Sequence, residues 1–178
     1  MLTFTSLGGK SFRVTGGGVP IIAYPEKVPE KSENVLTLLS APEENPPKGT
    51  LSWPGEYNIA EISLKGIGHT EGQQVSYVAE LDGVRCAFLS SPLQDWTDHE
   101  LEVVGDIDLL ALPTDDPKIV QKLVDAFDPR ILIILHGKDA GDFSASLKAV
   151  GGKNEPVEEY KLKGAMPAEG REVVVLAK

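Results

Sequence analysis

The sequence predicts an α/β fold in which β-sheets are covered by helices on their outer faces. Short apolar runs separated by turn residues fill the first ninety of the 178 positions, which is typical of β-strands. In the second half, strand and helix patterns alternate along the chain. The unbroken apolar run Ile131–Leu135 is typical of a strand that is buried on both faces.

The predicted strands of the first half are short and are separated by residues that favour turns. Gly16-Gly17-Gly18 and Asp82-Gly83 tolerate the positive φ angles of hairpin turns. Segments 26–32 and 41–50 are rich in Pro, Glu, Lys and Asn, so we expect exposed loops there. The expected strands are Leu2–Ser6, Ser11–Thr15, Pro20–Tyr24, Val35–Leu39, Tyr57–Leu64, Val75–Leu81 and Val84–Leu89.

Helix signals mark the second half. Thr97 and Glu100 have the spacing of a capping box, which predicts a short helix ending near Val104. Asp116 before Pro117 has the pattern of an N-cap with proline at the first helical position, and apolar residues recur at helical spacing as far as Phe127. A third helix is expected over residues 141–150. The accompanying strands are Asp108–Leu112, Ile131–Leu135, Val157–Leu162 and Glu172–Leu176.

Composition excludes several classes of protein. The chain length suits a single domain spanning residues 1–178, and 17 basic against 27 acidic residues give a formal net charge of −10. This charge repels nucleic acid and anionic membranes. Cys86 is the sole cysteine, so no internal disulfide can form. The N-terminus lacks a signal-peptide pattern and no apolar run approaches the ~18 residues needed to span a bilayer, so we expect a cytoplasmic protein.

His136 is the first candidate for a functional site. It stands directly after the apolar run Ile131–Leu135. In sheets covered on both faces, ligands and reacting groups gather at the ends of such strands. We therefore expect His136 to lie where a site would form.

Six segments of the chain resemble the metallo-β-lactamase fold superfamily, in particular its small ascorbate-phosphate-lactonase-like branch of metal-dependent hydrolases. The most specific is WPGEYNI, which resembles the family's P-G-E-Y-E-[IV] signature. The others are LGGKSFRV, VLTLLSAPEEN, YVAELDGVRCAFLSS, DLLALP and DPRILIILHG. The resemblance implies a four-layer α/β/β/α sandwich of two mixed β-sheets, with the site at the edge between the sheets.

The metal ligands that the resemblance implies are mostly absent. The family's four-ligand motif falls on Ser40, Pro42, Glu44 and Asn45, its early histidine on Gly9, and its bridging aspartate on Ser91. Its last histidine is retained as His136. A hydrolytic zinc needs about three nitrogen, sulfur or carboxylate ligands and an open position for water. The sequence therefore predicts a vestigial ligand-binding site formed by Ser40, Glu44, Asn45, His69, Ser91 and His136, without a bound metal.

Other chemically active residues of the sequence also have structural explanations. Asp115, Asp116 and Asp139 have oxygen ligands for a hard cation near His136, but Asp116 is also explained as a helix cap. Serine nucleophiles at Ser40, Ser90 or Ser91 would need a neighbouring base. His99 is explained as an exposed residue of the first helical turn. The run Gly8-Gly9-Lys10-Ser11 does not have the spacing of a phosphate-binding loop.

Two functional hypotheses follow from these observations. The preferred one is a protein of this fold that has neither a competent metal centre nor a cofactor and that serves as a non-catalytic binding or assembly module. The alternative is a hydrolase of a small phosphorylated or lactone-like substrate, using a rebuilt or metal-free site near His136 or a weakly held zinc or other divalent metal. The sequence leaves open whether the partner is a small molecule, another protein or a second copy of the chain.

Overall fold

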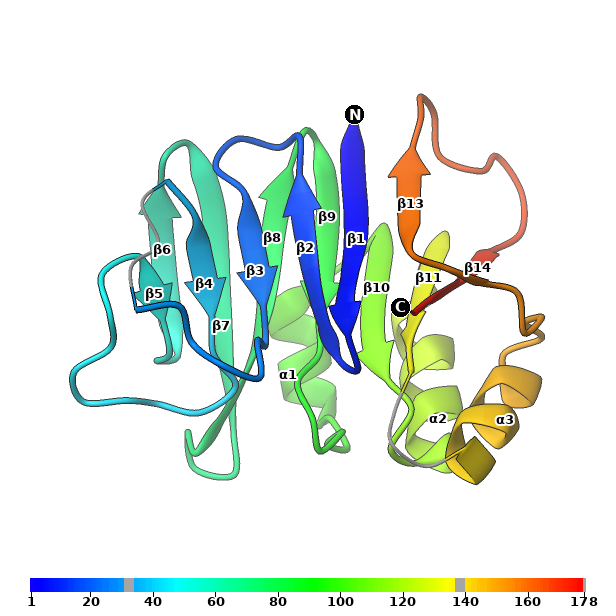
Figure 1. The fold of residues 1–178 in the computed structure, drawn as a ribbon. Coiled ribbons are helices and arrows are strands. Elements are labelled where there is room, and N and C mark those ends of the chain that lie inside the picture. Colours follow the sequence, from blue (N-terminus) through cyan, green and yellow to red (C-terminus); the bar gives the residue numbers. More distant parts are fainter. Residues whose placement is uncertain (31–33, 137–139, 178) are drawn as a thin grey trace.

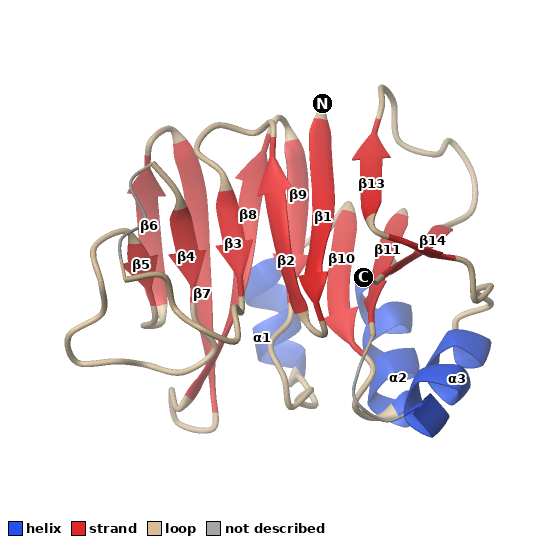
Figure 2. Cartoon of the chain, viewed as in Figure 1, coloured by secondary structure: helices blue, strands red, loops and turns tan. Residues whose placement is uncertain are grey.

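The computed structural model describes residues 1–30, 34–136 and 140–177. Two β-sheets face each other and form the centre of the molecule (Figures 1 and 2). The helices lie toward the lower edge of the two sheets in these views.

The first sheet has six strands in the order β13-β1-β2-β3-β4-β5. The pairs β3–β4 and β4–β5 are parallel and the remaining pairs are antiparallel, so the sheet is mixed. Its strands are β1 (Leu2–Gly8), β2 (Ser11–Thr15), β3 (Ile21–Ala23), β4 (Leu36–Leu38), β5 (Thr50–Leu51) and β13 (Glu159–Leu162).

The second sheet has eight strands in the order β12-β14-β11-β10-β9-β8-β7-β6. Strands from β12 to β9 pair in parallel, whereas β9, β8, β7 and β6 pair antiparallel, so this sheet is also mixed. Its strands are β6 (Gly55–Ile59), β7 (Ile62–His69), β8 (Gln74–Leu81), β9 (Val84–Phe88), β10 (Leu109–Pro113), β11 (Ile131–Leu135), β12 (Pro156–Val157) and β14 (Glu172–Leu176).

Three helices cover the outer face of the eight-stranded sheet: α1 (Asp98–Val104), α2 (Pro117–Phe127) and α3 (Ala140–Ala149) (Figure 2). The predicted caps are confirmed, because Thr97 and Glu100 form a capping box and Asp116 accepts from two backbone amides of α2. The predicted sandwich of two mixed sheets is confirmed. The prediction also included a helix layer over the six-stranded sheet, and the described residues form no helix there. No helix within residues 1–30, 34–136 and 140–177 is long and apolar enough to cross a membrane.

Strand β11 shows why the apolar run carries no alternation. Ile131, Ile133 and Leu135 face the core between the two sheets. Leu132 and Ile134 face the second core, between the sheet and the helices. All five side chains are buried, so every position along the strand must be apolar.

Two predicted strands are wrong because each is divided. The run Tyr57–Leu64 contains a tight turn at Ala60 and Glu61, whose φ angles are 48° and 67°, and this turn separates β6 from β7. The run Val157–Leu162 is divided between the two sheets. Val157 pairs with β14, whereas the residues from Glu159 onward pair with β1.

Candidate functional site

A cavity of about 480 Å³ opens at one edge of the sandwich, between the two sheets. Strands β3, β4, β9, β10, β11 and β14 all end at this edge, and the turn between β1 and β2 completes it (Figure 1). Such edges are where α/β proteins bind ligands. The cavity is lined by Gly9, Lys10, Ser11, Tyr24, Glu26, Ser40, Leu89, Ser91, Pro113, His136 and Ala177.

A lysine and a serine of the cavity wall form a polar cluster with an adjacent aspartate. Lys10 Nζ lies 2.6 Å from Asp115 Oδ1 and also donates to Ser91 Oγ. Ser91 Oγ in turn donates to Asp115 Oδ2 at 2.7 Å. The side chains of Lys10 and Asp115 are only 29% and 20% exposed, so the ion pair is largely shielded from water. We refer to Lys10, Ser91 and Asp115 as the lysine cluster.

The three residues of the lysine cluster come from three different loops. Lys10 lies in the turn between β1 and β2, where Gly8 and Gly9 adopt φ angles of 100° and 56° that favour glycine. Ser91 follows β9, and Asp115 lies between β10 and α2. The backbone amide of Leu93 donates to Asp115 Oδ2 at 3.0 Å. Both oxygens of Asp115 therefore already accept hydrogen bonds from the protein.

Two further hydroxyl groups at the cavity donate to backbone carbonyls. Ser11 Oγ donates to the carbonyl of Tyr24. Tyr24 Oη donates to the carbonyl of Phe88 at 2.6 Å, which ties the two sheets together beside the cavity. Burial raises the pKa of the Tyr24 phenol well above its ordinary value, with the nearby Tyr77 as a smaller cause. Tyr24 thus remains a neutral hydrogen-bond donor at the cavity.

His136 reaches the cavity from the end of β11, as the sequence predicts for the end of a buried strand. Its ring stacks on Phe143 of α3, with ring centroids 4.2 Å apart and an interplanar angle of 24°. This packing orients the imidazole between α3 and the cavity.

The structure brings together only part of the predicted site. Ser40, Ser91 and His136 line the cavity, together with Gly9. Glu44 and Asn45 are exposed in the segment between β4 and β5 and are not among the lining residues. Pro42 is likewise outside the lining, and Asp139 lies outside the described residues.

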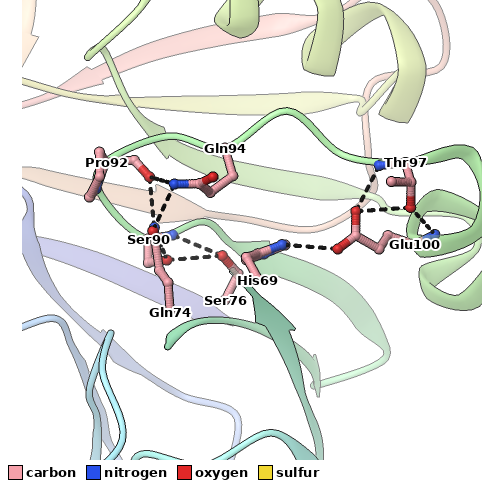
Figure 3. Close-up of polar contacts among 8 residues, drawn as sticks. All are labelled: His69, Gln74, Ser76, Ser90, Pro92, Gln94, Thr97 and Glu100. Atoms are coloured by element: carbon pink, nitrogen blue, oxygen red, sulfur yellow. Dashed lines mark hydrogen bonds and ion pairs between the residues drawn. The ribbon is translucent and has the colours of Figure 1, made fainter. Parts of the chain in front are cut away.

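His69 does not join this cavity, which corrects its inclusion in the predicted site. It ends β7 and is only 5% exposed, because it packs beneath α1 on the helix side of the sheet. Its ring contacts Trp96 at a centroid distance of 4.6 Å. Its Nδ1 lies 3.2 Å from Glu100 Oε1 (Figure 3). His99, in contrast, is exposed in the first turn of α1, as predicted.

The surroundings of His69 favour its neutral form. A carboxylate can only accept, so Nδ1 carries the proton that faces Glu100. Nε2 is buried without a hydrogen-bond partner among the described residues. Burial lowers the pKa of His69 below its ordinary value, although the charge and hydrogen bond of Glu100 oppose this shift. Burial alone would raise the pKa of Glu100, but hydrogen bonds from Thr97 and the proximity of His69 outweigh it and lower that pKa.

A separate buried polar network joins Gln74 and Ser76 of β8 to the loop after β9 (Figure 3). Gln74 Nε2 donates to Ser90 Oγ at 2.8 Å and to the carbonyl of Pro92 at 2.7 Å. Ser76 Oγ accepts from the amide of Ser90 at 3.1 Å. Ser90 is therefore a structural residue, whereas its neighbour Ser91 reaches the cavity.

The described side chains at the cavity do not fit a zinc ion. Across residues 1–30, 34–136 and 140–177, no group of three His, Cys, Asp or Glu side chains converges on a point suited to a metal. Asp115 is engaged by Lys10, Ser91 and Leu93, and Ser40 and Ser91 offer hydroxyl oxygens, which are poor zinc ligands. The ammonium group of Lys10 would also repel a divalent cation placed beside Ser91.

Comparison with solved structures identifies the fold. The chain is similar to a Thermotoga maritima protein named as a candidate Zn-dependent hydrolase of the metallo-β-lactamase superfamily, with 21% identity, a TM-score of 0.80 and coverage of 99% of both chains. It is also similar to Igni18, a metallo hydrolase of Ignicoccus hospitalis, with 13% identity, a TM-score of 0.58 and coverage of 91% of this chain and 99% of that one.

A more distant likeness links the chain to CmlA, a diiron β-hydroxylase of Streptomyces venezuelae, at 9% identity and a TM-score of 0.53. The likeness covers 83% of this chain and 47% of CmlA. No family model matches the sequence, and no curated protein matches it significantly. The resemblance to the metallo-β-lactamase fold superfamily is thus confirmed for the fold, whereas the ascorbate-phosphate-lactonase-like branch stays a prediction.

The sequence patterns do not predict that Lys10 and Asp115, the two charged residues of this site, are partners. Lys10 stands in a glycine-containing run that lacks the spacing of a phosphate-binding loop, and Asp115 stands among carboxylates that suit a hard cation. One signal was available, because Lys10 directly follows Gly9, a position that the resemblance assigns to the site.

Proposed function

We propose that this protein is a metal-independent, non-catalytic module that binds a small molecule in the cavity at the sheet edge. The observation that carries the proposal is the ion pair between Lys10 and Asp115, which is joined by Ser91. The resemblance places two former ligand positions at Gly9 and Ser91, directly beside this ion pair. The lysine cluster thus supplies an ammonium group, paired with a carboxylate, where the resemblance implies a metal.

The cavity itself favours a small molecule over a protein partner. Its volume of about 480 Å³ falls in the range of pockets that bind small molecules. It is a concave site that combines apolar walls with a few polar groups. A protein partner would instead require an extended surface.

Metal content tests the proposal. The protein as purified should contain no stoichiometric zinc, iron or manganese, and calorimetric titration with zinc should show no site of one equivalent. About one equivalent of metal, lost in a His136→Ala variant, would refute the proposal.

A second candidate is a metal-free hydrolase with Ser91 as nucleophile, which the contact between Lys10 and Ser91 favours. A serine nucleophile needs a base that accepts its proton. Here the Lys10 nitrogen is paired as an ammonium with Asp115, and Ser91 directs its own proton to the Asp115 carboxylate. The contacts therefore support binding better than acyl transfer.

Hydrolysis of p-nitrophenyl acetate separates the two candidates. We expect the rate of the purified protein to be unchanged by Ser91→Ala, since any background reaction then comes from elsewhere on the surface. Lys122→Met is the matched control for Lys10→Met, because Lys122 forms an exposed ion pair with Asp95. A rate that falls in Ser91→Ala and in Lys10→Met, but not in Lys122→Met, would establish the hydrolase instead.

A further inference from the structure

We propose that the ligand of the cavity is a small organic acid with a single negative charge on an apolar body, held by its carboxylate at the Lys10 ammonium. This inference rests on the proposed function and specifies its ligand. It follows from the donors, the charges and the walls of the cavity.

The Lys10 ammonium has a donor to offer a ligand. An ammonium group carries three N–H donors. Two are directed at Asp115 and Ser91. Lys10 is among the residues that line the cavity, whereas Asp115 is not. The remaining donor of Lys10 is therefore available on the cavity side, and charge-assisted bonds to a carboxylate are the strongest it can make.

The charges around the cavity limit the ligand to one negative charge. Lys10 is the one lysine or arginine among the described lining residues. Asp115 already neutralises part of its charge at 2.6 Å. Glu26, an exposed lining residue, adds a carboxylate close to Gly9. A Cβ atom added to Gly9 would lie 3.7 Å from Glu26 Oε1. A second anionic group on the ligand would meet Glu26 without a second cation.

A phosphate monoester is disfavoured for the same reason. Its group carries about −1.5 to −2 charges at neutral pH, whereas a carboxylate carries one. Phosphate recognition generally relies on arginine clusters or on several converging donors. The cavity offers one ammonium, so a carboxylate matches its charge better.

The walls of the cavity indicate an apolar body for the ligand. Leu89, Pro113 and Ala177 are apolar lining residues, and Tyr24 also lines the cavity while its hydroxyl is engaged with the carbonyl of Phe88. His136 adds a flat ring that Phe143 holds in place. Aromatic and short-chain acids combine the single charge with the apolar surface that these walls can cover.

Calorimetric titration with benzoate and hexanoate tests the inference, with benzamide and phenyl phosphate as matched probes. Wild-type protein should bind the two acids with one site and bind benzamide and phenyl phosphate more weakly. Lys10→Met should weaken benzoate binding by about ten- to a hundredfold, the loss of one charge-assisted hydrogen bond. Lys122→Met should leave benzoate binding unchanged.

A fold control keeps the experiment decisive. Unfolding curves should show that Lys10→Met is folded, and Lys10→Arg, which keeps the charge, should bind benzoate better than Lys10→Met. Equal binding of benzamide, tighter binding of phenyl phosphate, or benzoate binding that is indifferent to Lys10→Met would overturn the inference. Failure of both acids to bind up to their solubility limits would also overturn it. These outcomes leave the metal-independence of the proposed function intact, because stoichiometric zinc alone would refute that.

Discussion

His136 and His69 each stand at the end of a strand of the eight-stranded sheet, yet their surroundings differ. His136 opens onto the cavity at the sheet edge, near the lysine cluster. His69 has a carboxylate partner, Glu100, but is sealed beneath α1 by Trp96. The histidine with the identified carboxylate partner is thus the one that lies outside the cavity. Access to the cavity, rather than the chemistry of the pair, decides which region can meet a ligand.

The two regions also differ in how well they accommodate a positively charged side chain. In the buried region, burial lowers the pKa of His69, and Nε2 has no hydrogen-bond partner among the described residues. These surroundings disfavour a protonated, positively charged imidazole. At the cavity, Lys10 keeps a carboxylate partner and remains partly exposed. The first arrangement stabilises the fold, and the second offers a charge to solvent and ligands.

The largest expected effect distinguishes the two tryptophans of the chain. Trp96 is 4% exposed and packs on His69 and Phe127, so Trp96→Ala should cost about 3 to 5 kcal/mol of unfolding free energy. Trp53 is 50% exposed, so Trp53→Ala should cost less than about 1 kcal/mol. Denaturant unfolding of both variants measures the difference. Equal losses would show that the seal over His69 is not a packed core.

A smaller effect compares two ion pairs. Asp115→Asn leaves the shielded Lys10 ammonium without its carboxylate and should cost about 1 to 3 kcal/mol. Asp95 is 56% exposed in its ion pair with Lys122, so Asp95→Asn should cost less than about 0.5 kcal/mol. A domain of this size loses roughly 2 to 4 °C of melting temperature per kcal/mol, which thermal unfolding resolves. Indistinguishable melting temperatures would mean that the lysine cluster is a surface contact.

The pH dependence of stability should reveal the buried histidine. The pKa of His69 is lower in the folded state, so the unfolded chain binds a proton first as pH falls. Stability should therefore be complete above the unfolded value of about 6.5 and should decline as pH falls below it toward the folded pKa. The unfolding free energy of the wild type should drop by up to about 1 kcal/mol between about pH 7 and pH 5.5.

Histidine variants assign that slope. His69→Gln should flatten it, whereas His99→Gln, at an exposed position, should retain it. Glu100 also has a lowered pKa, so its contribution is lost only in more acid solution, below its unfolded value of about 4.3. An unchanged slope in His69→Gln would show that His69 is not held neutral.

Local sequence signals predicted much of the fold. The caps of α1 and α2 and the strand β11 follow from residues that are neighbours in the chain, such as Asp116 before Pro117. The turn at Asp82 and Gly83 was also predicted, and their φ angles are 52° and 74°. The turn at Ala60 and Glu61 was missed because neither residue type favours a positive φ angle.

The candidate site depends on contacts that no local pattern encodes. Lys10 and Ser91 are 81 positions apart in the chain and meet only because the turn between β1 and β2 lies beside the end of β9. The resemblance identified Ser40, Ser91 and His136 as neighbours, since it supplied the fold in advance. It gave no role to Lys10, because a lysine there has no counterpart among the ligands that it carries over.

Removing or adding metal should have no effect on stability. This expectation tests the central claim that the lysine cluster holds the cavity edge without a metal. Thermal unfolding should give the same midpoint with EDTA, without additions and with added zinc. Metal bound to the native state alone would stabilise it by about 2.7 kcal/mol at a hundredfold excess over its dissociation constant. Identical midpoints are the result that we predict. A loss of several degrees in EDTA, recovered when zinc is restored, would contradict it.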